Sequence, residues 1–218
     1  MKRFCIFSIL ILCFLFSINI SFAQKSKTKT QPVKQTKVDL GILRQNTYTN
    51  DLFELKLEFP FGWLVGDNML ESQLMEIQKQ SLSPKVKQLM NRLTPLLGGY
   101  RALPGSKAEN SNLKIVVESV TAVPKIKTGK DYLSIIKTTI NATQMPTGFT
   151  VSDIKNEMID GKSIDYLETK YGANHKRSYV MVKKGFAVLI TIDSYNQSDF
   201  DELHKVLTEA DLDYKKTN

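Results

Sequence analysis

The chain has 218 residues and carries 30 lysines and arginines against 22 aspartates and glutamates, a formal net charge of +8. Most of this excess precedes residue 38, because the stretch 38–218 holds 23 basic and 22 acidic side chains. A nearly neutral body, without basic residues interleaved with aromatic ones, cannot drive phosphate binding. The sequence therefore predicts no nucleic-acid partner.

The first residues have the pattern of a secretory signal peptide. Lys2 and Arg3 precede an apolar run at 4–16, and the small residues Ser21 and Ala23 occupy the positions that a signal peptidase recognises. The run is shorter than the about 20 apolar residues of a membrane-spanning helix, which disfavours a retained anchor. We predict a signal peptide at 1–23, export to the periplasm or the extracellular space, and no transmembrane segment after cleavage.

Both cysteines, Cys5 and Cys13, lie inside this segment. A lipoprotein cleaved at Cys13 is not expected, because Leu12 is not the small residue that such cleavage requires. The mature chain would then contain no cysteine, which excludes disulfides, thiolate nucleophiles and cysteine-bound metals. A single domain at 38–218 must be held together by its core, and a domain of this size buries about 70% of its unfolded-chain surface.

Residues 24–37, QKSKTKTQPVKQTK, contain five lysines and no acidic residue. The segment has almost nothing apolar to bury, so the sequence predicts a disordered leader. We interpret it as a solvated spacer. The alternative is a weak contact with an anionic surface, either lipid or cell-wall polymer.

The first strand pattern is FELKLEF at 53–59, where apolar and charged residues alternate strictly until Pro60. One face of this strand should line the core of the sheet. A helical insert is then expected at 68–97. Asn68 and Glu71 have the spacing of a capping box at its start, and Pro95 marks the end of its second helix.

The rest of the chain alternates between strand and helix patterns. Asp160-Gly161 is a strong signal for a two-residue hairpin, and residues 183–185 mark a second one. The run FAVLITI at 186–192 is apolar on both faces and predicts a central strand covered on both sides. We expect strands at 100–103, 113–120, 151–159, 163–171, 177–182 and 186–192, and helices that begin at the caps Thr128 and Ser198.

These elements predict an α+β domain, an α/β/α sandwich with a mostly antiparallel central sheet and helices on both faces. The layout resembles the PsbP/Mog-like fold family. The residues that carry this resemblance are the lead-in at 48–50, the strand that ends in Pro60-Phe61-Gly62-Trp63, the hairpin around Asp160-Gly161, the segment 179–186 and the C-terminal helix. The resemblance covers about residues 47 to 213. It implies a non-catalytic fold used for docking onto larger assemblies or as an accessory factor.

Residues suited to catalysis or metal binding are scarce. His175 and His204 each lack a second histidine at helical spacing, so both are interpreted as packing or loop residues. The carboxylates Asp199, Asp201 and Glu202 lie at an expected helix start, where negative charge is favourable. Neither a nucleophile elbow nor a phosphate-binding loop occurs. The sequence predicts no catalytic, cofactor-binding or metal-binding residue, and hence no enzyme and no cofactor.

Trp63 is the single tryptophan, and we expect it to close the end of the core. An exposed Phe61, or an exposed edge of Trp63, remains as a docking surface. The function expected is that of a secreted or periplasmic binding or accessory protein with an envelope or secreted protein as its partner. The alternative is a small-molecule or lipid carrier, or a minor hydrolase, with a pocket under the 68–97 insert.

Overall fold

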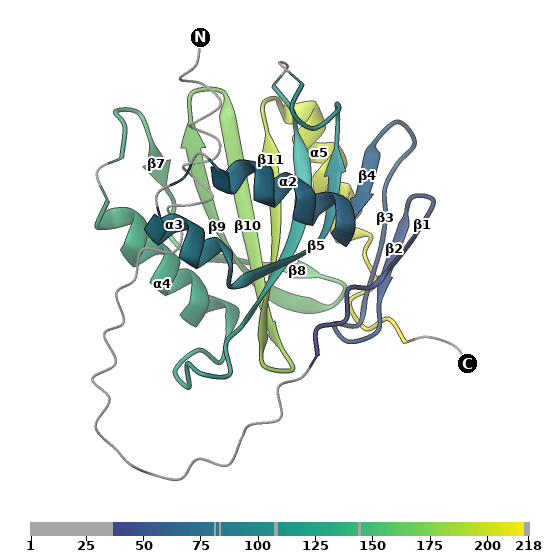
Figure 1. Ribbon diagram of the computed structural model, residues 1–218, viewed down its shortest axis with the longest axis horizontal. Helices are drawn as coiled ribbons and strands as arrows, with labels where there is room; N and C mark the ends of the chain where they lie inside the picture. The colour runs from purple at the N-terminus through teal and green to yellow at the C-terminus, as the bar shows by residue number, and fades with distance from the viewer. Residues whose placement is uncertain (1–36, 81, 83, 107–108, 144, 216–218) are drawn as a thin grey trace.

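The computed structural model describes residues 37–80, 82, 84–106, 109–143 and 145–215 (Figure 1). The signal peptide expected at 1–23, and all but the last residue of the leader expected at 24–37, lie outside these residues. Within the described ranges, no helix combines the length and the apolar character needed to cross a membrane.

Two antiparallel sheets and four helices make up the described part of the chain. The main sheet has the strand order β4-β5-β6-β11-β10-β9-β7, with β8 also paired to β9, and the small sheet has the order β1-β2-β3. The main-sheet strands are β4 (Leu64–Asp67), β5 (Leu93–Tyr100), β6 (Asn112–Ser119), β7 (Thr150–Val151), β8 (Lys155–Ile159), β9 (Lys162–Tyr171), β10 (Asn174–Lys183) and β11 (Phe186–Ser194). The remaining elements are β1 (Ile42–Arg44), β2 (Thr47–Asn50), β3 (Leu55–Glu58), α2 (Asn68–Gln80), α3 (Pro84–Met90), α4 (Gly129–Asn141) and α5 (Gln197–Thr208). The predicted α+β class with antiparallel pairing is confirmed.

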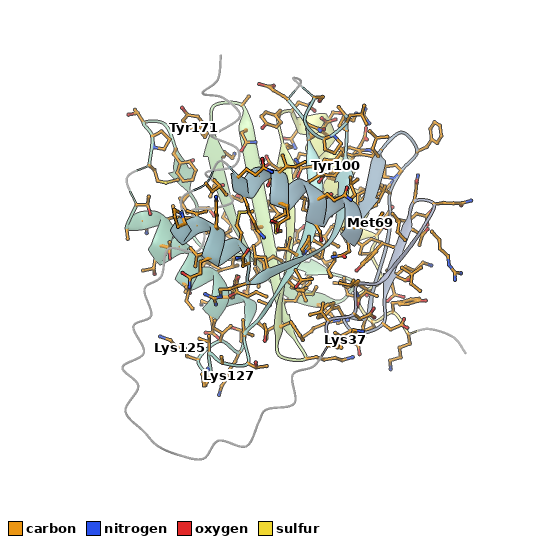
Figure 2. All side chains as sticks on the ribbon, in the orientation of Figure 1. Lys37, Met69, Tyr100, Lys125, Lys127 and Tyr171 are labelled. Carbon is orange, nitrogen blue, oxygen red and sulfur yellow. The ribbon has the colours of Figure 1, made fainter. Side chains whose placement is uncertain are left out.

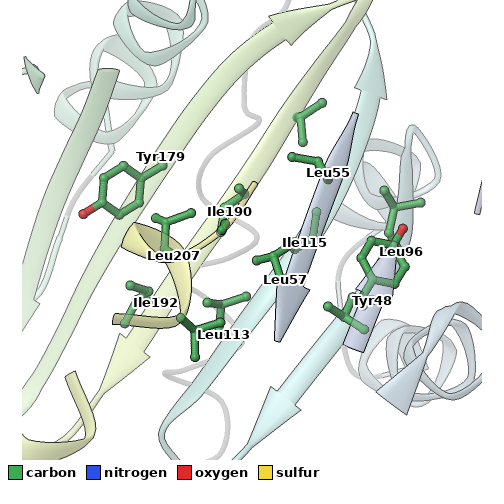
Figure 3. Close-up of a cluster of buried hydrophobic side chains, with 14 of the residues drawn as sticks. Tyr48, Leu55, Leu57, Leu96, Leu113, Ile115, Tyr179, Ile190, Ile192 and Leu207 are labelled. Atoms are coloured by element: carbon green, nitrogen blue, oxygen red, sulfur yellow. The ribbon is translucent and has the colours of Figure 1, made fainter. Parts of the chain in front are cut away.

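Strand β11 divides the core in two. Every residue of this strand is buried, and alternate side chains enter two hydrophobic clusters. Val188 and Ile190 belong to the first cluster, together with residues of α5 and of the small sheet, and Figure 3 shows part of it. Ala187 and Leu189 belong to the second cluster, together with residues of α2, α3 and α4. The central strand predicted at 186–192 is therefore confirmed, and the two sides of the main sheet are called the first face and the second face below.

The strand predicted at 53–59 differs from the observed one in length and in partner. Only Leu55–Glu58 is a strand, and it pairs with β2 in the small sheet rather than with the main sheet. Glu54 has a left-handed backbone with φ of 52°, and the Phe53 amide donates to Asn50 Oδ1 at 2.9 Å, so the chain turns before β3 begins. The alternation still predicts burial correctly, because Leu55 and Leu57 are buried and Lys56 and Glu58 are exposed.

The helical insert expected at 68–97 is wrong in its last part, because residues from Leu93 onward form the buried strand β5. Pro95 is accommodated by an irregularity in the pairing with β6, between Pro95 and Leu97. The two glycines that follow are needed for packing rather than for ending a helix. A Cβ at Gly99 would collide with the Phe59 ring, and one at Gly98 would collide with the Glu71 carboxylate. Of the strand expected at 100–103, only Tyr100 is part of a strand.

The starts of α4 and α5 test two of the predicted caps. At α4 the capping box is confirmed, since the Asp131 amide donates to Thr128 Oγ1 and the Thr128 amide donates to Asp131 Oδ2. At α5 the predicted cap Ser198 is wrong. Asn196 caps this helix instead, accepting from the Asp199 amide at 2.8 Å.

Both predicted hairpins are present in the main sheet. Asp160 and Gly161 join β8 to β9 with φ values of 48° and 70°, the left-handed pair that a type I′ turn requires. Lys184 and Gly185 join β10 to β11 with φ values of 49° and 83°. The second turn is one residue shorter than expected, because Lys183 still pairs with Phe186.

Candidate functional site

The turn at 60–63, between β3 and β4, contains two aromatic residues, one buried and one exposed. Trp63 is 4% exposed and lies in the first-face cluster, as expected from the sequence. Phe61 is 99% exposed. Gly62 between them has φ of 93°, a backbone conformation that other residues rarely adopt, and this reversal directs the two rings to different surroundings.

Polar contacts fasten this turn to the first half of α5. Trp63 Nε1 donates to Glu202 Oε2 at 2.8 Å, and Arg101 Nη1 lies 3.2 Å from the same oxygen. The Arg101 guanidinium lies over the Trp63 ring, 5.3 Å from its centroid, and Arg101 Nε reaches Asp199 Oδ1 at 3.5 Å. The turn is thus held by the indole, by a cation–π contact and by shared carboxylates.

Other apolar side chains are exposed at the same end of the sheet. Leu64 pairs with Tyr100, so the turn before β4 and the loop after β5 leave the sheet at one end. Leu64 and Leu103 are 43% and 69% exposed. We call Phe61, Leu64 and Leu103 the tip surface.

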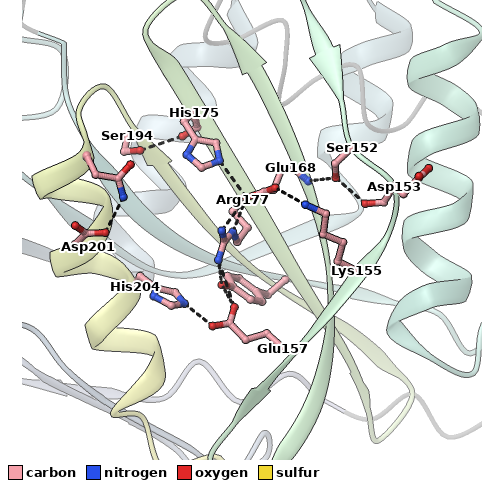
Figure 4. Close-up of polar contacts among 12 residues, drawn as sticks. Ser152, Asp153, Lys155, Glu157, Glu168, His175, Arg177, Ser194, Asp201 and His204 are labelled. Atoms are coloured by element: carbon pink, nitrogen blue, oxygen red, sulfur yellow. Dashed lines mark hydrogen bonds and ion pairs between the residues drawn. The ribbon is translucent and has the colours of Figure 1, made fainter.

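A cluster of charged residues on β8, β9 and β10 lies beside α5 (Figure 4). Arg177 of β10 stands opposite Glu168 of β9, and its Nε and Nη2 atoms lie 2.9 Å and 2.8 Å from Glu168 Oε1. Its Nη1 atom lies 3.3 Å from Glu157 Oε2. The guanidinium is also stacked between rings, 4.7 Å from the Tyr166 centroid and 4.8 Å from that of Phe200.

The two histidines of the chain flank one ring of α5. His175 stacks on Phe200 with ring centroids 4.8 Å apart, and His204 stacks on the same ring at 5.6 Å. His175 Nε2 lies 3.2 Å from Glu168 Oε1, and His204 Nε2 lies 2.8 Å from Glu157 Oε1. Each imidazole therefore joins an aromatic contact on α5 to a carboxylate of the sheet.

Burial and pairing set the charge states of this cluster. Burial alone would raise the pKa of Glu168, but the bonds from Arg177 and Lys155 outweigh it and lower that pKa below its ordinary value. Burial would lower the pKa of Arg177, and its contacts with Tyr179 and Glu168 raise it instead. Burial, with Lys170 nearby, lowers the pKa of His175. The arrangement favours a charged Arg177–Glu168 pair beside a neutral imidazole.

The sequence predicts that His175 and His204 are packing or loop residues. Arg177, Glu157 and Glu168 are not among the candidate residues that it gives. One signal was available, since His175 and Arg177 are two apart on a strand and must share a face. The contribution of α5 depends on tertiary packing. No group of three or more histidines or acids is placed to hold a metal ion within the described ranges.

A third polar group lies under α2, where the sequence suggested a pocket. The capping box expected at Asn68 and Glu71 is wrong, because the first amides of α2 donate to Asp67 Oδ1. Glu71 is buried instead and accepts from the Tyr100 hydroxyl at 2.5 Å. Figure 2 labels Tyr100 next to this helix. Lys114 of β6 lies 4.0 Å from the other oxygen of Glu71.

Comparisons with known proteins find a likeness in structure but none in sequence. No protein-family model matches the chain, and no curated protein matches it in sequence. Among solved structures, the chain is similar to the solution structure of cyanobacterial PsbP (CyanoP) from Synechocystis sp. PCC 6803, with a TM-score of 0.44 and 14% sequence identity over 81% of this chain and 97% of that one. A likeness to Mog proteins is not shown. At this level of similarity no function or residue role is transferred.

Proposed function

We propose that this chain is an exported, non-catalytic binding or accessory protein with an α/β/α core of the PsbP-like type. In this proposal it docks onto an envelope or secreted protein through the tip surface. The observation that carries the proposal is Phe61, which is 99% exposed on a turn that the buried Trp63 holds in place.

The energetics of the turn suit a docking role. Burying a phenylalanine side chain against a partner contributes about 1.5–3 kcal/mol. Because Trp63 and Arg101 already hold the turn on α5, docking would cost little additional ordering of the backbone. Leu64 and Leu103 add partly exposed apolar surface at the same end of the sheet.

The acids and bases of the first face favour a structural role over a chemical one. Glu157 is engaged by His204 and Arg177, and Glu168 is engaged by Arg177 and His175. These contacts join α5 to the sheet and so support the surface that presents Phe61.

Partner capture tests the docking role. The mature protein would be cross-linked in the intact envelope, with Phe61→Ser compared against Met158→Ser, a matched change at a residue that is 63% exposed on β8. We expect Phe61→Ser to reduce recovery of the cross-linked partner at least about tenfold, with an unchanged melting temperature, and Met158→Ser to leave recovery unchanged. Equal recovery from both variants would contradict docking through the tip surface.

Export is tested separately by cell fractionation and N-terminal sequencing. We expect the protein in the periplasm or the medium, with a mature chain that begins at Gln24. A cytoplasmic protein that retains residues 1–23 would contradict this part of the proposal.

A further inference from the structure

The second face of the main sheet changes character along its strands. Near the β10–β11 turn it is apolar, with Val180, Ala187 and Leu189 packed into the second cluster. Toward the other end of the same strands it is polar. Cross-strand pairing aligns Lys114 with Thr191 and Ser178 in one row, and Asn112 with Asp193, Lys176 and Thr169 in the next. We call these seven residues the polar strip.

Most of the strip is internally paired. Lys176 Nζ lies 3.0 Å from Asp193 Oδ2, and the Asn174 side-chain amide donates to the other oxygen of Asp193. The hydroxyls of Ser178 and Thr191 lie 3.3 Å apart. Since one hydroxyl donates to the other, the acceptor of that pair keeps a hydrogen that it can donate elsewhere.

Lys114 is the exception. Among the described residues the nearest partners of its ammonium are Glu71, at 4.0 Å, and the Tyr100 ring, at 5.3 Å from the centroid, and the ammonium donates a hydrogen bond to neither. An ammonium carries three N–H donors, and a partly buried one without protein acceptors takes its hydrogen-bond acceptors from water or from a ligand. Burial accordingly lowers the pKa of Lys114 and raises that of Glu71. The Lys114 side chain keeps 21% of its surface exposed, so a small molecule can reach it.

We propose that the polar strip binds a small monocarboxylate, which accepts hydrogen bonds from Lys114 and from the free hydroxyl hydrogen of the Ser178–Thr191 pair. Lys114 and the free hydroxyl hydrogen are donors that have no hydrogen-bonded acceptor among the described residues, so their ligand must supply acceptor oxygens. Lys114 supplies one positive charge that no hydrogen-bonded acid neutralises. Glu71 and Asp193 lie nearby and would repel a second negative charge, which favours a monoanion over a phosphate dianion.

The test uses butyrate as the probe, butyramide as its neutral counterpart and inorganic phosphate as the dianion. Calorimetric titrations of the mature protein at matched ionic strength would extend to about 50 mM, because so small a ligand is expected to bind in the millimolar range. We expect saturable binding of butyrate, at least about tenfold weaker binding of butyramide, and weaker binding of phosphate than of butyrate.

Three variants distinguish binding at the polar strip from nonspecific effects of charge on butyrate binding. Lys114→Met should weaken butyrate binding at least about tenfold, because it removes the charged donor. Glu71→Gln should strengthen binding about threefold or more, because it removes the competing carboxylate and still accepts from Tyr100. Lys125→Met, at an exposed loop lysine, should leave binding unchanged.

The increase expected for Glu71→Gln keeps the proposal falsifiable if Lys114→Met folds poorly, since an unfolded protein cannot bind more tightly. The proposal is overturned if wild-type protein binds no butyrate over this range, if butyramide binds equally well, if phosphate binds more tightly, or if Lys125→Met weakens binding as much as Lys114→Met.

Discussion

On the first face of the main sheet, Arg177 lies within hydrogen-bonding distance of two carboxylates and contacts aromatic rings. On the second face, Lys114 lies 4.0 Å from a single carboxylate. Both side chains are mostly buried, 17% exposed for Arg177 and 21% for Lys114, yet only Arg177 has hydrogen-bonded acceptors in the protein. A buried charge that is paired and hydrogen-bonded fixes the elements around it, whereas one without acceptors lowers stability unless something binds to it. The comparison favours a structural role for the first face and supports the ligand site that we propose on the second.

The largest loss of stability should come from removing Trp63, whose ring is buried in the cluster on the first face. Trp63→Ala removes a buried ring and its bond to Glu202, so we expect the free energy of unfolding to fall by about 3–5 kcal/mol in urea denaturation. The control is Phe61→Ala on the same turn, which should change stability by less than about 0.5 kcal/mol. Similar losses for the two variants would show that the turn is not divided between core and surface.

Removing Arg177, the paired cation of the first face, should cause the next largest loss of stability. Arg177→Met leaves Glu168 and Glu157 without their shared cation, and we expect a loss of about 2 kcal/mol, reduced from fully buried cases by the partial exposure of the cluster. Lys155→Met removes another partner of Glu168, but that lysine is 51% exposed and the loss should stay below about 1 kcal/mol. If both variants lose the same amount, the Arg177 cluster is not what joins α5 to the sheet.

The sequence predicts the parts of this comparison that depend on local pattern. Alternation in FELKLEF predicted burial of Leu55 and Leu57, and the apolar run at 186–192 predicted a strand covered on both faces. The sequence did not predict β5, because Pro95 and the glycines that follow it are locally unfavourable in a strand. An irregular pairing with β6 and close packing accommodate them in the folded protein.

The charge clusters could not be predicted in the same way. The contacts of Arg177 require the register of β9 against β10, which places Glu168 opposite it, and the docking of α5, which brings Phe200. Glu71 shows the limit most clearly. Its spacing from Asn68 favours a capping role, but the approach of Tyr100 and Lys114 draws its carboxylate under the helix.

Acidification should affect the two faces in opposite directions, with the second face showing the larger effect. Burial raises the pKa of Glu71 above its ordinary value of 4.5, so the folded state binds a proton at a higher pH than the unfolded state. Stability therefore increases as pH falls through the folded pKa toward 4.5. The unfolding free energy of the wild type, relative to Glu71→Gln, should rise on the order of 1 kcal/mol in that window. A difference that is constant with pH would show that Glu71 titrates normally.

The first face should show the smallest effect, with the opposite sign. Burial lowers the pKa of His175 below its ordinary value of 6.5, so as pH falls past 6.5 the unfolded state takes up a proton that the folded state resists. The unfolded state then binds more protons, and stability falls until the folded imidazole is also protonated. Relative to His175→Gln, the wild type should lose a few tenths of a kcal/mol in this window, because the side chain is partly exposed and Glu168 offsets part of the penalty. Urea denaturation of both proteins at several pH values between about 7 and 5 measures the difference. A gain in wild-type stability over that range would mean that Glu168 raises the pKa of His175 more than burial lowers it. The first face, like the second, would then contain a charge without a full partner.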